Sequence, residues 1–200
     1  MAEQGAPPPA ALVISLRQAL AAAGLPSDDP EAAATAERVA TLWWEQWVGL
    51  RQPIPALVPL PSTTEEAELV LVRDVPFQST CLHHLTPIVG TMDFAYLPDR
   101  WLIGIGAPAL LLHHFAARPT LQERLTTQLA DQVMDRLAPK GVLVHLRARH
   151  GCMSVRGARA PGLVETVAAR GALRHGPLRA EFFTRLGLPD RGDGVEGIDG

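Results

Sequence analysis

Two cysteines and a histidine are the residues in this sequence best suited to bind a metal ion together. Cys81 and His84 lie in STCLHHL, residues 79–85, and Cys152 lies in HGC, residues 150–152. The Cys-x-x-His spacing lets a thiolate and an imidazole bind the same ion. With Cys152 they would form a three-ligand zinc site. Three protein ligands with an open fourth position are typical of catalytic zinc.

A simpler interpretation is that both cysteines belong to the core, because free cysteine is among the most buried residue types. A single Cys-x-x-His motif does not exclude this interpretation. Both cysteines, however, lie close to histidines, His83 and His150, on segments that otherwise resemble strands. This second observation favours the metal site.

The elements that must position these residues begin with a helical region. Leucines at 12, 16 and 20, followed by Gly24 and Pro26, predict a short helix. Asp29 before Pro30 predicts the N-cap and first residue of a second helix. Its apolar face, which we interpret as core or subunit contact, carries Val39, Leu42, Trp43 and Trp47. Residues 51–63 contain four prolines and predict an irregular connection.

The remaining pattern predicts strands and helices in an alternating order. Apolar or alternating runs predict strands over residues 68–75, 88–96, 142–148 and 163–169. Helical spacing predicts helices over residues 108–115, from Pro119 to about Leu137, and over residues 178–186. This order predicts an α+β fold with an antiparallel sheet. We expect a disordered tail (1–9), N-terminal helices with a proline-rich connection (10–63), a catalytic domain (64–188) and a flexible tail (189–200).

Composition and charge exclude several classes of protein. The net charge of −3 gives no polybasic surface for nucleic acid, and two distant cysteines do not suggest a disulfide framework. The acidic start lacks the pattern of a signal peptide, and no run approaches the ~20 apolar residues of a membrane span. By default, we expect a cytoplasmic protein with no membrane or nucleic-acid partner.

Six stretches of the chain, in the same order and with nearly constant spacing, resemble GTP cyclohydrolase I. They are ERVA (37–40), LVRDVPF (71–77), CLHHL (81–85), QERLT (122–126), HGC (150–152) and RG (156–157). The resemblance runs from about residue 30 to residue 187. It implies a tunnelling fold, in which sheets and paired helices of several subunits close into a ring. That ring is usually a decamer with active sites at subunit junctions.

The resemblance also implies a reaction and the residues that carry it. Members of the family add water to C8 of guanine, open the imidazole ring and release the carbon as formate, with zinc activating the water. On the family pattern, the zinc ligands are Cys81, His84 and Cys152. His83 and His150 match the proton-transfer histidines, although without the resemblance each would be interpreted as a neighbour of the metal or a satisfied core group.

The base-recognition residues are implied in the same way. Glu123 matches the carboxylate that accepts hydrogen bonds from guanine N1–H and the 2-amino group, a two-pronged acceptor facing two donors. Without the resemblance, Glu123 would be interpreted as a first-turn glutamate favoured by the helix dipole. Gln122 matches a neighbouring residue that helps to hold the base, and Arg156 matches an arginine on the phosphate side.

The stretch that binds the triphosphate in the family departs from the family pattern, as do Leu82, where the family has an acidic residue, and residues 160–166, where it has a Ser/Thr-rich strand. Where the family has Gly-Leu-Ser-Lys-x-x-Arg to bind the triphosphate, this chain has GIGAPAL, residues 104–110. Ala107 and Leu110 therefore replace the lysine and the arginine. Each missing charge-assisted hydrogen bond is worth on the order of 1.5–3 kcal/mol. His113 and His114 could partly substitute, but positions on a helix face explain them better.

These observations leave three hypotheses. The first is a zinc cyclohydrolase that hydrolyses a C–N bond of a purine-like or other nitrogen heterocycle which is not a triphosphate. The second is authentic GTP cyclohydrolase I, with the phosphates bound by Arg156, Arg159 or arginines of a neighbouring subunit. The third is a non-catalytic binding member of the ring, against which the retained ligands and histidines argue.

Overall fold

The computed structural model describes residues 6–26, 28–62, 69–157 and 159–188. The chain forms two compact units that divide between Pro53 and Ile54. The expected tail at residues 189–200, and most of the expected tail at residues 1–9, lie outside the described residues. None of the described helices is both long and apolar enough to cross a membrane.

The N-terminal unit is helical. Its elements are α1 (Ala10–Ala22), α2 (Pro30–Ala33), α3 (Thr35–Gln46) and the 3₁₀ helix η1 (Val48–Leu50). The side chain of Asp29 accepts a hydrogen bond from Glu31 N at 2.9 Å, as expected for an N-cap. The single helix predicted after Pro30 is wrong in one respect, because it is interrupted at Ala34 between α2 and α3.

The buried side of α3 is made of small residues, Ala36 and Ala40, which allow close packing. Trp43 and Trp47 stack on each other with ring centroids 4.7 Å apart, as their spacing on one helix face suggests. Leu42 is 47% exposed in the isolated chain, so it does not belong to the core of one subunit, and the interpretation as a subunit contact stays a prediction.

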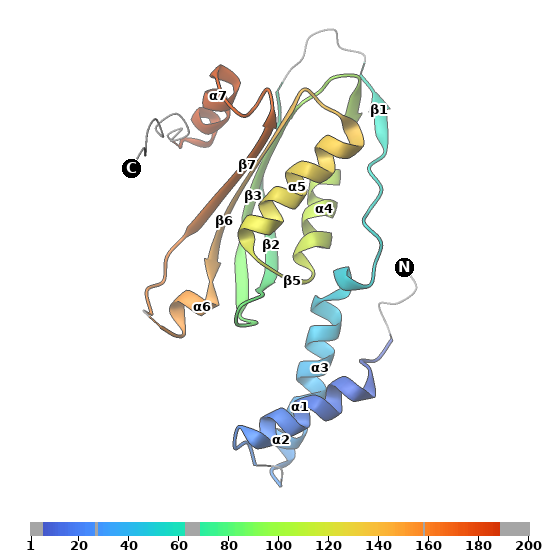
Figure 1. The fold of residues 1–200 in the computed structure, drawn as a ribbon, viewed down its shortest axis with the longest axis vertical. Coiled ribbons are helices and arrows are strands. Elements are labelled where there is room, and N and C mark those ends of the chain that lie inside the picture. The colour runs from blue at the N-terminus through green and yellow to red at the C-terminus, as the bar shows by residue number, and fades with distance from the viewer. Residues whose placement is uncertain (1–5, 27, 63–68, 158, 189–200) are drawn as a thin grey trace, which may run out of the picture. The chain divides into compact units, whose positions relative to one another are not determined.

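The second unit is built on a five-stranded sheet with the order β5-β2-β3-β6-β7, seen in Figure 1. Its strands are β2 (Val70–Cys81), β3 (Pro87–Leu97), β5 (Pro119–Thr120), β6 (Gly141–His150) and β7 (Val164–Gly171). Only β5 runs parallel to its neighbour, and the other pairs are antiparallel. A separate two-stranded sheet joins β1 (Pro59–Pro61) to β4 (Trp101–Ile103).

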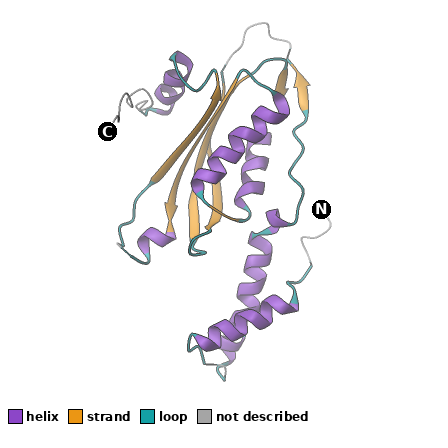
Figure 2. Ribbon diagram, in the orientation of Figure 1, coloured by secondary structure: helices purple, strands orange, loops and turns teal. Residues whose placement is uncertain are grey.

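Helices cover both faces of this sheet, as Figures 1 and 2 show. α4 (Ala107–Ala116) and α5 (Gln122–Leu137) pack on one face, where Leu111, Leu125 and Leu146 belong to the larger core. α7 (Pro177–Leu186) packs on the other face through Phe182 and Phe183. With helices on both sides, β6 is buried along nearly its whole length. The predicted α+β class is confirmed.

Several local features of the second unit differ from the sequence predictions. β2 continues through residues 70–81, so the Cys81 motif ends this strand instead of following it. The expected opening of the long helix at Pro119 is wrong, because residues 119–120 form β5 and Leu121 is the N-cap of α5. The short strands β1 and β4 and the short helix α6 (Gly151–Ser154) were not predicted. Each of these elements has four residues or fewer, too few for a periodic pattern.

Candidate metal centre and active site

Cys81 lies at the last position of β2, where the chain enters a tight turn. Cys81 N donates to Thr86 O at 2.8 Å, and Leu85 N donates to Cys81 O at 2.8 Å, which closes the turn around residues 82–85. Leu85 adopts a left-handed conformation with φ of 53°. The turn is also held to β5, because Leu82 N donates to Thr120 O at 3.0 Å. This local folding brings His84 back toward Cys81.

Cys152 reaches the same place from the other side of β3. The final residue of β6, His150, pairs with Ile88 of β3, and α6 begins at the next residue. A Cβ on Gly151 would lie 3.1 Å from Thr86 Cβ and 3.3 Å from both Pro87 Cδ and Pro87 O. Glycine at this position therefore lets α6, and with it Cys152, approach the turn that carries His84.

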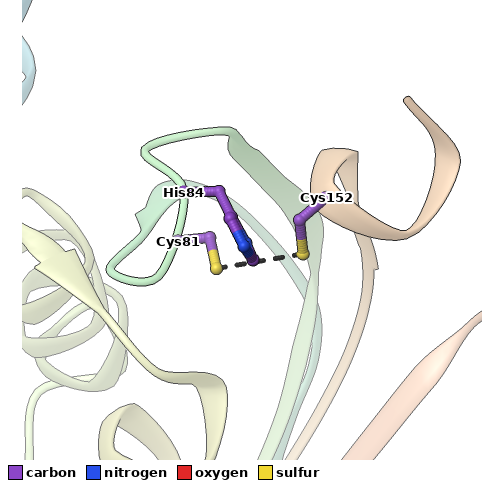
Figure 3. A group of neighbouring side chains, drawn as sticks. All are labelled: Cys81, His84 and Cys152. Atoms are coloured by element: carbon purple, nitrogen blue, oxygen red, sulfur yellow. Dashed lines mark hydrogen bonds between the residues drawn. The ribbon is translucent and has the colours of Figure 1, made fainter. Parts of the chain in front are cut away.

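The three expected ligands converge in Figure 3, where their side chains point toward one another. A nitrogen of His84 and the sulfur atoms of Cys81 and Cys152 all lie within 4.8 Å of one another. The two sulfur atoms are 3.9 Å apart. Two thiolates bound to tetrahedral zinc at about 2.3 Å would be separated by roughly 3.8 Å. The donor set and its spacing therefore fit a zinc ion.

The electrostatics of the two thiols support the same conclusion. Burial raises the pKa of Cys152, and the hydrogen bond and charge of Cys81 raise it further. Two adjacent thiolates repel each other, and a divalent cation between them would remove this penalty. Arg156 Nη1 donates a hydrogen bond to His84 Nε2, so that this nitrogen acts as an acceptor in the chain alone.

The remaining expected residues lie around this centre. His150 Nε2 is 2.7 Å from the side-chain oxygen of Gln122 at the first position of α5. Burial lowers the pKa of His150, while the negative charge of Glu123 opposes this shift. Glu123 is exposed in the first turn of α5. His83 is also exposed, and its ring lies edge-on to that of His84 with centroids 6.1 Å apart.

The apolar stretch at residues 104–110 lies away from this centre within one chain. α4 runs beside β2, and its C-terminal end is fixed where Ser79 Oγ donates to Ala116 O at 2.8 Å. Ala107 begins the helix, about 14 Å from its last residue at 1.5 Å per residue. Leu110, near the same end, is 59% exposed. The positions expected to face phosphate are therefore not beside Cys81 in the same subunit.

Three residues with structural roles at the site were not identified from the sequence. Gly151 permits the close approach of α6. A glycine between His150 and Cys152 is the one feature of the sequence that could have indicated this close packing. Thr126 and Thr166 join Gln122 in a buried hydrogen-bond network. A threonine in a helix or strand carries no local sign of such a partner, because the contacts bridge 40 and 44 positions along the chain.

Comparison with known proteins identifies relatives over most of the chain. Residues 13–187 match the family model for GTP cyclohydrolase I. The chain is 39% identical to GTP cyclohydrolase 1 of Leifsonia xyli subsp. xyli, over 86% of this chain and 92% of that protein. It is 41% identical to GTP cyclohydrolase 1 of Carboxydothermus hydrogenoformans, over 87% of this chain and 92% of that protein.

Among solved structures, an apo archaeosine synthase QueF-Like matches 56% of this chain and 100% of its own, at 20% identity and a TM-score of 0.42. That likeness is too low to support an inference. The family match and the curved antiparallel sheet with paired helices agree with the tunnelling fold predicted from the sequence. The chain belongs to the GTP cyclohydrolase I family.

Proposed function

We propose that this chain is a zinc-dependent GTP cyclohydrolase that opens the imidazole ring of a guanine nucleotide and releases C8 as formate. The observation that carries the proposal is the convergence of Cys81, His84 and Cys152 within 4.8 Å, at the end of the sheet that also carries His150. The curated relatives, 39% and 41% identical over most of both chains, are named for this activity.

Zinc held by these three ligands would supply a Lewis acid that makes water a nucleophile at neutral pH. Residues of the chain itself would bind the base and transfer protons. The exposed carboxylate of Glu123 can accept hydrogen bonds from two adjacent N–H donors of the base. His150, whose pKa is lowered by burial, offers a neutral imidazole that can accept a proton. His83, exposed in the turn beside His84, is the second candidate for proton transfer.

The names of the relatives favour GTP as the substrate. Arg156, in contact with His84, is one cation that could face a phosphate from within the same chain. Further cations would come from Arg159 or from a neighbouring copy, since residues 104–110 contain neither lysine nor arginine.

A second candidate, a guanine-like substrate with fewer phosphates or none, is favoured by that same stretch. Leu110 presents an exposed apolar side chain where the family has an arginine, and Ala107 replaces the lysine. Unpaired phosphate charge against such a lining would be costly to desolvate. The two candidates share the metal centre and base recognition, and differ only in what binds the far end of the substrate.

We further propose that the protein is a symmetric homo-oligomer, a decamer on the family pattern. In the chain as described, β7 lies at an edge of the sheet and pairs only with β6. Open antiparallel edges are a liability that closure with another copy removes. Light scattering should give a mass several times that of one chain, and a stable monomer at micromolar concentration would contradict the proposal.

The function is tested by incubating the zinc-loaded protein with guanine, guanosine, GMP and GTP in parallel. Formate release and loss of the intact imidazole absorbance report ring opening. Efficient turnover of GTP with a low-micromolar KM would support the authentic enzyme. Preference for guanosine or GMP over GTP would support the second candidate. Absence of formate from all four compounds would rule out the proposed reaction.

A further inference from the structure

The side-chain amide of Gln122 is buried and fully engaged within the protein. Gln122 is 1% exposed, although it is the first residue of α5. Its Nε2, which carries two hydrogens, lies within hydrogen-bond distance of three acceptors: Leu146 O at 3.2 Å, Val164 O at 3.0 Å and Thr166 Oγ1 at 3.1 Å. Its Oε1 lies 2.7 Å from His150 Nε2. A group with these partners has little capacity left for a substrate.

These contacts fix the orientation of the amide. Leu146 and Val164 present main-chain carbonyl oxygens, which only accept hydrogen bonds, so the atom that faces them must be the NH₂ group. The atom that faces His150 is therefore the amide oxygen. Because this oxygen can only accept, His150 Nε2 must carry the hydrogen of the 2.7 Å bond. In the neutral imidazole, Nδ1 is then the nitrogen with a free lone pair.

Two threonines hold the amide in this orientation through a closed circuit of hydrogen bonds. Thr126, itself 1% exposed, donates its only hydroxyl hydrogen to Gln122 O at 2.7 Å. The 2.6 Å bond between the two threonine hydroxyls must therefore be donated by Thr166. Thr166 Oγ1 in turn accepts from Gln122 Nε2. These hydrogen bonds link α5, β6 and β7 directly beneath Glu123 and His150, the two candidate active-site residues next to Gln122.

We propose that Gln122 is a positioning residue that holds His150 as the Nε2–H tautomer, so that protons are exchanged with the substrate at Nδ1. Thr126 and Thr166 act by keeping the amide of Gln122 in place. This inference rests on the proposed function, in which His150 transfers protons, and it replaces the expected role of Gln122 in holding the base. During turnover Nδ1 accepts one proton from a reacting group and later returns it. Nε2 keeps its hydrogen throughout, and Gln122 Oε1 remains the acceptor.

The first test is kinetic and uses the zinc-loaded, full-length Gln122→Met protein with its best guanine substrate. Methionine has a similar length but neither accepts from His150 nor donates to the carbonyls. We expect kcat for formate release to fall about 10²-fold, the scale of misplacing a catalytic group, with KM changed less than twofold and zinc content unchanged. A rise in KM with kcat preserved would show that Gln122 binds the base and would overturn the inference.

A milder pair of variants guards against misfolding of Gln122→Met. Thr166→Val keeps the shape but removes the hydroxyl, and Thr166→Ser restores it. We expect kcat to fall several-fold in the valine variant and to recover in the serine variant. The matched control is Thr91→Val on β3, whose cross-strand partner is Arg147 on the opposite face of the sheet. Equal kcat in Thr166→Val, Thr166→Ser and wild type would contradict a role for the circuit.

The second test does not depend on turnover. ¹⁵N spectra of the zinc-loaded, histidine-labelled protein distinguish the two imidazole tautomers, and the His150 signals are those missing from His150→Gln. We expect hydrogen on Nε2 in wild type and a mixture of tautomers in Gln122→Met. Hydrogen on Nδ1 in wild type would overturn the inference whatever the substrate. Wild-type protein that releases no formate would instead defeat the proposed function, and the spectrum would still decide the tautomer.

Discussion

Cys81 Sγ and Cys152 Sγ lie 3.9 Å apart although 71 positions separate the two residues in the chain. One thiol ends β2 and the other lies in α6, so the folding of the sheet brings them together. This distance is much longer than the ~2.05 Å of a disulfide bond, but short enough for both sulfur atoms to bind the same ion.

Replacement of Cys152 by serine should remove most of the bound zinc. A serine hydroxyl is a much poorer zinc ligand than a thiolate, and two ligands alone bind weakly. Elemental analysis of purified Cys152→Ser should give far less than one zinc per chain. Ser154→Ala, in the same short helix, is the matched control and should keep its metal. Wild-type zinc content in Cys152→Ser would remove this residue from the site.

Gly151 offers a separate test of how α6 positions its cysteine. A Cβ there would approach Thr86 Cβ to 3.1 Å, and the larger valine side chain would force α6 away from the turn. Gly151→Val should therefore lower zinc affinity by at least tenfold while leaving the sheet folded, as measured by competition with a chelator and by circular dichroism.

The control for that experiment is Gly162→Ala, where the new Cβ would meet only Met153 Cε at an ordinary 3.5 Å. If Gly151→Val bound zinc as tightly as Gly162→Ala, close packing at residue 151 would not determine the position of Cys152.

Loss of either candidate proton-transfer histidine should reduce turnover without removing the metal. For His150→Ala we expect kcat to fall by about 10²–10⁴-fold, the usual range for general acid–base catalysis. His83→Ala should show a loss of the same kind. Formate release and zinc content are measured on the same samples. Near-wild-type turnover of zinc-loaded His150→Ala would leave His150 with a structural role only.

The sequence predicted the main elements because their patterns are local. The leucine spacing of α5 and the period-two alternation around β3 report burial directly, and both elements were found within a few residues of their expected bounds. The three candidate metal-binding residues could also be selected from the sequence, since few residue types bind zinc, and the structure brings them together. Elements such as α6 and β5 are too short for any period to develop.

The buried role of Gln122 was beyond the sequence for a different reason. Its partners lie on β6 and β7, and a glutamine before Glu123 at the start of a helix predicts exposure as readily as burial. The polar cluster of Asp93 and His145 was equally hidden. Alternation along β3 and β6 shows that these residues share a face, but only the packing of α7 shows that this face is buried.

That cluster makes a prediction about stability and pH. Burial of Asp93 opposes its ionisation, yet the contact with His145 at 3.5 Å, the hydrogen bond from Asp74 N and the charge of Arg147 hold its pKa below the ordinary value. A carboxyl whose pKa is depressed on folding contributes stability above its unfolded pKa, near 3.9. That stability is lost as the pH falls through the folded pKa.

Asp93→Asn should therefore be less stable than wild type at pH 7, by about 1–3 kcal/mol, because Arg147 loses a buried charged partner. The difference between the two proteins should shrink below about pH 4. Urea denaturation at several pH values measures both effects. A difference that stays constant from pH 7 to pH 3 would mean that the charge of Asp93 does not stabilise the fold.

The last prediction concerns the far end of the substrate. If Ala107 and Leu110 lie where a neighbouring copy would face the phosphates, Ala107→Lys together with Leu110→Arg should improve the binding of GTP selectively. Each new charge-assisted hydrogen bond is worth about 1.5–3 kcal/mol, so KM for GTP should fall at least tenfold while KM for guanosine stays the same. Asp135→Lys, an exposed position near the end of α5, adds the same two units of charge elsewhere and is the control. An equal gain in this control would indicate a general electrostatic effect. No gain in the double variant would mean that this segment does not reach the phosphates in the assembled protein.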